Sequence, residues 1–359
     1  MKKYLVAIFI FLFSVPAYAD FDAIDDVFVV ISSDYINEKS PKDIMVKGLN
    51  VLSSIDKAVY LKYTNDKIFF YYGPKMVKQF EMPVNTLSPE DWADFTKSII
   101  ATAIGVSDKI ELIDFEIPDR FAKEVFTGLD GYSHYYSAYS DLADTPKVAK
   151  RNFASRIVSD NILLIKILAF RKDVSQKVKQ EIDDCSQCKA LILDLRGNHG
   201  GLLDEAIKIT DMFLDEGIIT YTLSKDGTLP KFYTSTSGDI FSNKPIVILV
   251  DGFSASASEV LASALSEQNR AVLIGTQTYG KGTVQNVSKN ASSSAMAITT
   301  SYFYTPGGNK IDKLGLMPAV CTGGLKLRQY VTDGVCDRQD RFTNEADVEI
   351  AVKFIEGNL

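Results

Sequence analysis

The sequence predicts an α/β protein whose second half contains a mainly parallel sheet, preceded by a mainly helical domain. From about residue 157, short uninterrupted apolar stretches typical of buried strands alternate with segments of helical spacing. Such alternation is typical of mainly parallel α/β folds. Before that point helical periodicity prevails. With 359 residues, of which 46% are hydrophobic, the chain is long enough for two domains, each with its own core.

Residues 1–19 are expected to be a signal peptide. Two lysines precede an apolar run over residues 5–15, and Ala17-Tyr-Ala19 gives a small-x-small cleavage site. As a helix, the run would span roughly 16 Å, about half of a ~30 Å hydrocarbon core, so a signal peptide is favoured over a membrane span. We therefore expect an exported protein that is periplasmic or secreted.

Residues 20–150 are expected to form an N-terminal, mainly helical domain with one β-hairpin. Apolar residues recur at helical spacing in the first two predicted helices. Ser88-Pro-Glu-Asp91 opens a third, with acidic residues in the first turn, where the helix dipole favours them. Two aromatic-rich runs, 58–63 and 67–72, flank Thr64-Asn-Asp66 and predict the hairpin. The predicted helices are residues 21–35, 41–55, 88–104 and 118–126.

Residues 151–359 are expected to form the α/β core with a C-terminal extension. Its strands are predicted from continuous apolar runs, and its helices from the helical spacing between those runs. The predicted strands are residues 162–170, 190–195, 218–223, 246–250 and 271–275. The predicted helices are residues 175–183, 204–215, 256–268 and, in the extension, 344–355.

Composition and charge weigh against several function classes. The net charge is −7 and the sequence shows no basic patch, which is unfavourable for binding nucleic acid. The two histidines, His134 and His199, do not lie at metal-ligand spacing, so neither a metal nor an organic cofactor is expected. We interpret His199 as a loop residue and His134 as part of an aromatic turn.

Four cysteines in a chain that is expected to be exported point to disulfides, because an oxidising compartment favours pairing. Four cysteines can pair in three ways. We favour the local pairing of Cys185 with Cys188 and of Cys321 with Cys336. A redox or zinc role for the Cys-x-x-Cys stretch would need a thioredoxin-like context or a histidine at ligand spacing, and the sequence has neither.

A serine cluster, Ser254-Ala-Ser-Ala-Ser-Glu259, lies between a predicted strand and a predicted helix. A serine at a helix N-terminus shares its site with free backbone N–H groups, here including that of Ala257. One turn could therefore supply both a nucleophile and an oxyanion donor. With two histidines in the chain, a serine–lysine pair is a more natural interpretation than a Ser-His-Asp triad. The alternative is that Ser256 and Glu259 merely form the S-x-x-E capping box of the helix.

Two glycine-rich stretches could complete such a site. Gly200 and Gly201 could let the backbone approach a substrate and aim N–H groups at an oxyanion, or could simply form a tight turn. Nearby Arg196 is either a substrate contact or a buried arginine bonded to backbone carbonyls. Lys281 lies between two glycines, and Gln285 could orient its amine; the alternative is a solvated lysine in a surface turn. A lysine base requires its pKa to fall from ~10.4 to about 7–8, which costs roughly 4 kcal/mol.

Together these stretches resemble the C-terminal processing peptidases, the serine peptidase family S41 that includes the tail-specific proteases. The matching stretches are residues 193–202, 254–259, 279–285 and 315–318, in the family's order and at its spacings. The resemblance covers about residues 157–320. It implies a ClpP/crotonase-like protease core.

The resemblance also implies a role for each candidate residue. The family's nucleophile is the middle serine of the cluster and its base is a lysine 25 positions later, which correspond here to Ser256 and Lys281. Gln285 matches the family's lysine-orienting glutamine. The oxyanion donors would be the N–H groups of Ala257 and of one glycine of the Gly200-Gly201 pair. The implied reaction is peptide hydrolysis through an acyl-enzyme.

The N-terminal half departs from the family's pattern. Gly128–Tyr135 resembles the turn that precedes the PDZ domain in these enzymes, but the segment 138–161 that follows is too short to be one. The chain is therefore expected to lack a PDZ domain, and a regulatory or adaptor protein could take its place. We expect an exported serine endopeptidase that acts on unfolded or extended segments of envelope proteins.

Two alternative functions remain. The first is a catalytically silent or gated protein that binds or scaffolds a partner on the same fold. The second is acyl transfer or thioester hydrolysis, because the related crotonase architecture also presents a Gly-Gly oxyanion turn. The lack of a basic patch for an adenine or phosphate group weighs against the second. The sequence predicts no particular oligomeric state.

Overall fold

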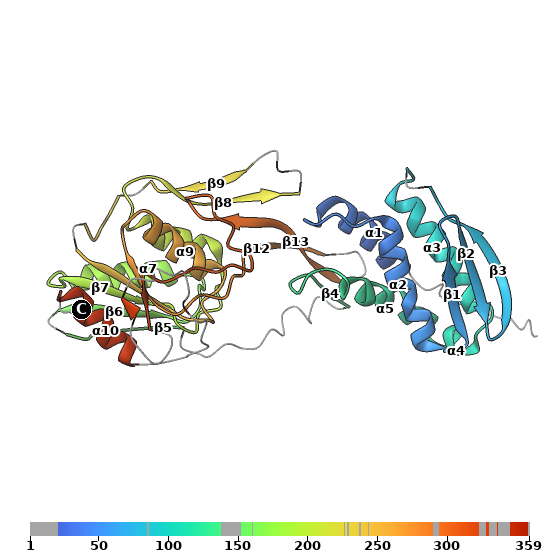
Figure 1. The fold of residues 1–359 in the computed structure, drawn as a ribbon, viewed down its shortest axis with the longest axis horizontal. Coiled ribbons are helices and arrows are strands. Elements are labelled where there is room, and N and C mark those ends of the chain that lie inside the picture. The colour runs from blue at the N-terminus through green and yellow to red at the C-terminus, as the bar shows by residue number, and fades with distance from the viewer. Residues whose placement is uncertain are drawn as a thin grey trace, which may run out of the picture. The chain divides into compact units, whose positions relative to one another are not determined.

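The computed structural model of the chain describes residues 21–84, 86–137, 152–159, 161–225, 227, 230–236, 238–242, 244–289, 294–322, 328–329, 336 and 345–357. The predicted signal peptide and the predicted domain boundary at residue 150 lie outside these residues. The chain divides into two compact units (Figure 1). The N-terminal unit comprises Met1–Ser33, Lys39–Tyr139 and Lys289–Ala295. The core unit comprises Asp34–Glu38, Ser140–Ser288 and Met296–Leu359.

The N-terminal unit consists mainly of helices that lie beside a small sheet (Figure 1). Its helices are α1 (Asp22–Asp34), α2 (Pro41–Ile55), α3 (Pro89–Ile104), α4 (Asp108–Glu111), the 3-10 helix η1 (Asp114–Glu116) and α5 (Ile117–Phe126). Ser40 and Ser88 cap α2 and α3, because their side chains accept the N–H groups of Asp43 and Asp91. The four helices that the sequence predicted in this region are present.

The sheet of the N-terminal unit has three antiparallel strands, where the sequence predicted a two-stranded hairpin. The strands are β1 (Val59–Tyr63), β2 (Lys67–Tyr72) and β3 (Lys75–Glu81), in the order β1-β2-β3. The predicted hairpin is β1 with β2, in which Tyr60 pairs with Tyr71. The prediction was incomplete because Phe80 is the one buried residue of β3, so this strand has no continuous apolar face in its sequence.

A seven-stranded sheet forms the centre of the core unit, in the order β15-β14-β11-β10-β7-β6-β5. Its strands are β5 (Phe153–Ile157), β6 (Ile162–Ile167), β7 (Ala190–Asp194), β10 (Ile246–Val250), β11 (Val272–Gly275), β14 (Val320–Cys321) and β15 (Arg328–Gln329). Neighbours from β6 to β14 pair in parallel, whereas the edge strands β5 and β15 pair antiparallel. The predicted mainly parallel α/β class is therefore confirmed.

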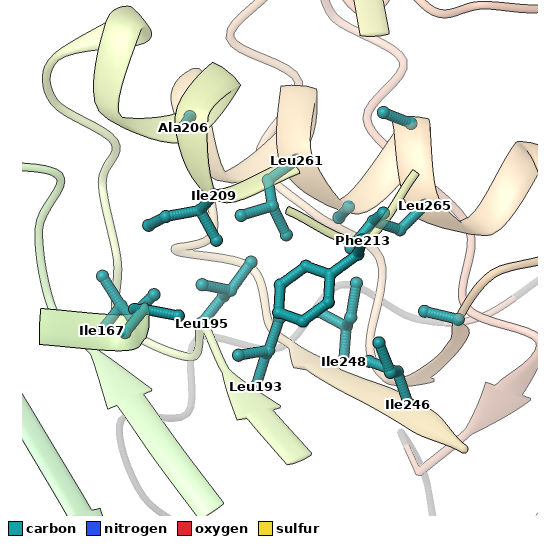
Figure 2. Close-up of a cluster of buried hydrophobic side chains, with 14 of the residues drawn as sticks. Ile167, Leu193, Leu195, Ala206, Ile209, Phe213, Ile246, Ile248, Leu261 and Leu265 are labelled. Atoms are coloured by element: carbon teal, nitrogen blue, oxygen red, sulfur yellow. The ribbon is translucent and has the colours of Figure 1, made fainter. Parts of the chain in front are cut away.

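Helices cover both faces of this sheet. The first face carries α7 (Val174–Asp184), α8 (Leu203–Asp211) and α9 (Ala257–Glu267), and the second carries α10 (Glu345–Ile355). Figure 2 shows Ile209 of α8 and Leu261 of α9 over Leu193 of β7 and Ile248 of β10. On the second face, Val348 of α10 joins a separate buried cluster. The two burials explain why β7 and β10 are apolar at nearly every position.

A second sheet in the core unit has the order β12-β13-β8-β9. Its strands are β8 (Ile218–Ser224), β9 (Lys231–Thr234), β12 (Thr283–Lys289) and β13 (Ala295–Tyr304). Of these, the sequence predicted β8 and missed the other three. The short β9 and the polar β12 lack a clear pattern, whereas β13 carries the β-branched and aromatic residues that are typical of a strand.

Both predicted disulfides are present. Cys185 at the end of α7 is bonded to Cys188, and Cys321 of β14 is bonded to Cys336. Of the helices in the described part of the chain, none is both long and apolar enough to span a bilayer.

Candidate active site

Three loops meet at one edge of the parallel sheet. They follow the carboxyl ends of three neighbouring parallel strands: the glycine turn 195–202 follows β7, the serine turn 251–256 follows β10, and the lysine loop 276–282 follows β11. Ligands of open α/β sheets bind outside these carboxyl ends. The sheet therefore gathers the three stretches that the sequence singled out.

Ser256 lies in a sharp turn at the N-terminus of α9. Its φ of 56° and ψ of −116° are uncommon for a residue with a side chain. Such conformations cost about 1–3 kcal/mol and cluster at active sites. The Ser256 side chain is half-buried between Ala255 and Ala257, whose small side chains are buried. The predicted strand, turn and helix around Ser256 are thus present.

The other two serines of the cluster are fully buried and hydrogen-bonded to the backbone. The Ser254 hydroxyl donates to the carbonyl of Leu195 at 2.9 Å, and the Ser258 hydroxyl donates to the carbonyl of Asn198 at 3.0 Å. Ser254 thus joins the serine turn to the glycine turn, and Ser258 joins the start of α9 to it. Of the three serines, Ser256 is the one that a substrate could reach.

The glycine turn lies directly against Ser256. Gly200 has a φ of 100°, and a Cβ added to it would lie 2.9 Å from the Cβ of Ser256 and 2.8 Å from the carbonyl oxygen of Ala255. Gly201 has a φ of 140°, and a Cβ added there would lie 2.3 Å from the carbonyl oxygen of Phe170. Both positions therefore require glycine, because of their backbone conformation and because of the close approach of other segments.

Asn198, which the sequence analysis missed, connects the glycine turn to the serine turn. Its side chain is fully buried: Nδ2 donates to the carbonyl of Ile167 at 2.9 Å, and Oδ1 accepts the N–H of Gly200 at 2.8 Å. Its own carbonyl accepts the N–H of Ala255 at 3.0 Å and the Ser258 hydroxyl. One signal could have found it, since an asparagine in a turn often bonds the backbone two residues on.

The hydrogen bonds of the two turns leave the backbone N–H groups of Gly201 and Ala257 available beside Ser256. The Gly200 N–H already donates to Asn198. Within the described ranges, the N–H groups of Gly201 and Ala257 donate to no acceptor. A free N–H is expected at the first residue of a helix such as α9. Of the three candidate N–H groups, that of Gly200 is taken by Asn198, whereas those of Gly201 and Ala257 have no acceptor within the described residues.

Glu259 ties the serine turn to the lysine loop. Its side chain is fully buried, and its Oε2 accepts the N–H groups of Ser256 and Lys281, each at 2.9 Å. Its Oε1 accepts the N–H of Gly280 at 2.7 Å and the hydroxyl of Thr278 at 2.5 Å. The capping contact between Glu259 and Ser256 is present. The same carboxylate also reaches Lys281, 22 residues further along the chain, which no local pattern indicates.

The four hydrogen bonds offset the cost of burying this carboxyl group. Burial raises the pKa of Glu259 above its usual value of 4.5, and the bonds from Thr278 and the three backbone N–H groups oppose that rise. A carboxylate has about four lone-pair sites, so these donors saturate it. Loss of the side chain would leave four donors without their acceptor in the interior.

Lys281 is half-buried in a loop whose path depends on Gly280. Gly280 has a φ of 84°, and a Cβ added to it would lie 2.9 Å from the backbone nitrogen of Gly315. The stretch that begins at Gly315 also braces the loop, because the Leu316 N–H donates to the Thr278 hydroxyl at 2.7 Å and the Thr278 N–H donates to the Leu316 carbonyl at 3.1 Å. The Gly-Leu-Met-Pro stretch thus supports the lysine loop.

Gln285 lies on β12, four residues after Lys281. Its Nε2 donates to the hydroxyls of Thr283 at 2.9 Å and Thr299 at 3.3 Å. Because the amide nitrogen is held by these two hydroxyls, the orientation of the amide oxygen is fixed as well. That oxygen can accept a hydrogen bond from an amine and carries no charge.

Arg196 is a buried structural arginine with 2% of its surface exposed. Its Nε and Nη2 donate to the two oxygens of Asp194, each at 2.8 Å, and Lys166 binds the same carboxylate at 3.1 Å. Burial acts to raise the pKa of Asp194, but the hydrogen bonds and charges of Arg196 and Lys166 together outweigh it and hold that pKa below its usual 3.8. The partners of Arg196 thus include carboxylates, where the sequence suggested backbone carbonyls.

Both histidines of the chain are exposed. His199 is exposed on the glycine turn, with its ring 5.4 Å from that of Phe253 in the serine turn. His134 is exposed on β4 (His134–Tyr136) of the N-terminal unit. Among the residues that the structure describes, no group of three or more His, Cys, Asp or Glu side chains could hold a metal ion.

Comparison with known proteins finds a family match for part of the chain. The model of Peptidase family S41 matches residues 161–321, which contain all three loops. Over this segment the chain is similar to peptidase family S41. The predicted resemblance to the C-terminal processing peptidases is confirmed over this segment.

Individual relatives of this S41 segment are similar over different lengths. The chain is 40% identical over 149 residues to the carboxy-terminal-processing protease of Bartonella bacilliformis, which is 42% of this chain and 33% of that relative. It is 28% identical over 325 residues to the "Probable CtpA-like serine protease" of Staphylococcus aureus, which is 84% of this chain and 64% of the relative. The chain thus spans about a third of the first relative's length.

A solved structure shares the fold over the whole chain. The lipoprotein from Streptococcus agalactiae superposes with a TM-score of 0.54 and 14% sequence identity, over 100% of both chains. At this identity the likeness concerns the fold alone.

Proposed function

We propose that the chain is an exported serine endopeptidase in which Ser256 is the nucleophile and Lys281 the general base. The observation that carries the proposal is the Glu259 carboxylate, whose Oε2 binds the N–H groups of both residues. A buried and fully bonded carboxylate is rigid, so the two side chains extend from one fixed anchor. The S41 match of residues 161–321 supports the same chemistry.

The N–H groups of Ala257 and Gly201 are the proposed oxyanion donors. Both lack an acceptor among the described residues, whereas the Gly200 N–H is taken by Asn198. Donors that are fixed before the reaction stabilise the charge of a tetrahedral intermediate without reorganising. Gly200 has a steric role, since its lack of a side chain keeps the space beside Ser256 open.

Lys281 can act as a base only when it is neutral. At pH 7 to 8 this requires a fall in its pKa of about 3 units, equivalent to roughly 4 kcal/mol. Partial burial favours the neutral amine, and Gln285 can accept a hydrogen bond from it without adding a countercharge. Lys281 then takes the proton of the Ser256 hydroxyl, delivers it to the leaving amine and activates the water that cleaves the acyl-enzyme.

The proposed substrates are unfolded or extended segments of envelope proteins, met after export. An extended peptide can add to the edge of a sheet through main-chain hydrogen bonds, which suits substrates without folded structure. The absence of a PDZ domain stays a prediction, so recognition of C-terminal tails is not part of the proposal.

Mass spectrometry of a reduced, unfolded protein incubated with the mature chain tests this function. We expect cleavage by the wild type and none by Ser256→Ala or Lys281→Ala. Ser266→Ala, on the same helix and bonded to the carbonyl of Ser263, is the matched control and should cleave normally. Full activity in Lys281→Ala would disprove its assignment as the base. Lack of cleavage by the wild type, together with no labelling of Ser256 by a fluorophosphonate, would favour the silent or gated alternative.

A further inference from the structure

The C-terminal helix α10 lies outside the S41 match, yet it packs against the sheet that carries the candidate active site. Val348 and Ala351 of α10 are buried against the second face of the sheet, in a cluster with Leu164, Ile192 and Leu249. That contact buries apolar surface and fixes the helix over strands β6, β7 and β10. The helix is thereby held beneath the strands that carry the glycine turn and the serine turn.

One acidic residue of α10 points into this interface. Asp347 is 3% exposed, and its Oδ2 accepts a hydrogen bond from Nη1 of Arg196 at 3.1 Å. Its other oxygen, Oδ1, is buried and has no hydrogen-bond partner within the described residues. A buried carboxylate is costly unless it is paired, so the contact with Arg196 is what makes Asp347 tolerable at this position.

Among the described residues, two buried carboxylates pair with Arg196. These are Asp194 and Asp347, and Asp194 also pairs with Lys166. Arg196, Asp194 and Asp347 are all at most 3% exposed. Removing Asp347 would take one carboxylate out of this buried group and would remove the acceptor of the bond from Nη1 of Arg196.

The Arg196 side chain also restrains the beginning of the glycine turn. Its guanidinium holds both oxygens of Asp194, and Oδ1 of Asp194 also accepts the backbone N–H of Arg196 at 3.1 Å. Arg196 is the residue before Gly197, whose N–H is in turn held by Asp251 of the serine turn at 3.0 Å. The beginning of the glycine turn is thus fixed by a carboxylate whose own position depends on the Arg196 side chain.

We propose that Asp347 is a positioning residue for catalysis: from the C-terminal helix it fixes Arg196 and, through it, the glycine turn that supplies an oxyanion donor. The proposal rests on the proposed function for its effect on turnover, but not for its effect on the turn. The alternative is a purely structural role, in which Asp347 only holds α10 against the sheet. In that case its loss would loosen the helix and leave the turn unchanged.

Three variants separate these two roles. Asp347→Ala removes the acceptor of the Arg196 bond, and Asp347→Asn removes the charge but keeps an acceptor oxygen. Glu349→Ala, an exposed acidic residue two positions along the same helix, is the matched control. Each variant is compared with the wild type by peptide cleavage kinetics and by hydrogen–deuterium exchange followed by mass spectrometry.

We expect Asp347→Ala to lower kcat by about tenfold or more with little change in KM, since a small displacement of a catalytic group can cost up to about 100-fold. Asp347→Asn should recover much of that loss, and Glu349→Ala should match the wild type. In Asp347→Ala, exchange should rise in peptides that cover residues 195–203 while peptides from β10 and α9 stay protected.

The exchange data decide the proposal even if no substrate is cleaved. Faster exchange confined to residues 195–203 and to α10 supports the positioning role. Unchanged exchange at residues 195–203 overturns it, and so does a uniform rise that extends to β10 and α9, because that pattern reports general destabilisation. An unaltered kcat in an active Asp347→Ala variant also overturns it. Absence of cleavage by the wild type, combined with the confined exchange pattern, would instead count against the proposed function.

Discussion

Replacing Glu259 by glutamine changes the buried link between the serine turn and the lysine loop with little change in shape. One acceptor oxygen becomes an NH₂ group, which must face two of the four donors. In the better orientation it faces Thr278 and Gly280, because the Thr278 hydroxyl can turn and accept, whereas the Gly280 N–H cannot. One buried N–H then loses its acceptor, which costs about 1–3 kcal/mol. The opposite orientation would strand the N–H groups of both Ser256 and Lys281 and cost about twice as much.

Urea unfolding followed by circular dichroism measures this cost. We expect Glu259→Gln to lower the free energy of unfolding by about 1–3 kcal/mol, and Glu259→Ala, which strands all four donors, to lower it further and to abolish cleavage. Glu267→Gln is the control, because Glu267 is exposed at the other end of α9 and bonds the N–H of Gly307 at 2.7 Å. Its effect should stay below about 0.5 kcal/mol. An equally small effect of Glu259→Gln would refute the reasoning.

Three other substitutions test neighbouring parts of the structure. Gly200→Ala should abolish peptide cleavage, because the new Cβ would lie 2.9 Å from the Cβ of Ser256, the proposed nucleophile. Gly227→Ala is the control and should cleave normally, because Gly227 also has a positive φ, 61°, but open space around it. Equal activity of the two variants would contradict the steric argument. Asp194→Asn should make the free energy of unfolding depend less on pH in the acid range. The pKa of Asp194 is lowered in the folded state, so its contribution is complete above the unfolded value of 3.8 and is lost as the pH falls through the folded value. Urea unfolding between about pH 3 and pH 6 should therefore show a weaker loss at acid pH in the variant than in the wild type, and equal losses would argue against this account. Serine at both Cys321 and Cys336 should lower the free energy of unfolding by about 3 kcal/mol, the loop-closure value for a separation of 15 residues. A loss under about 1 kcal/mol, again from urea unfolding, would argue against the loop-closure account.

Elements with a strong local pattern could be predicted from the sequence. The strands β7 and β10 are buried at every position, so their apolar runs identify them, and the Ser88-Pro start identifies α3. The strands β3, β9 and β12 were missed because they are short or largely polar, and sheet pairing with neighbours far along the chain decides their conformation. The predicted disulfides are short-range, which made the local pairing the natural choice.

The sequence by itself determined which groups could carry chemistry. It placed Ser256 and Ala257 at the start of one helix, two glycines in one turn and Lys281 between two others. These features depend on residues within a few positions of one another, so composition and spacing reveal them.

Only the tertiary structure decided how these groups are held together. Glu259 reaches the N–H of Lys281, Asn198 reaches that of Ala255, and Asp347 reaches Arg196 across 151 residues. Each contact exists because parallel pairing brings the carboxyl ends of β7, β10 and β11 to the same edge of the sheet and because α10 packs beneath them. Such contacts depend on register and packing over long separations, which local propensity does not encode.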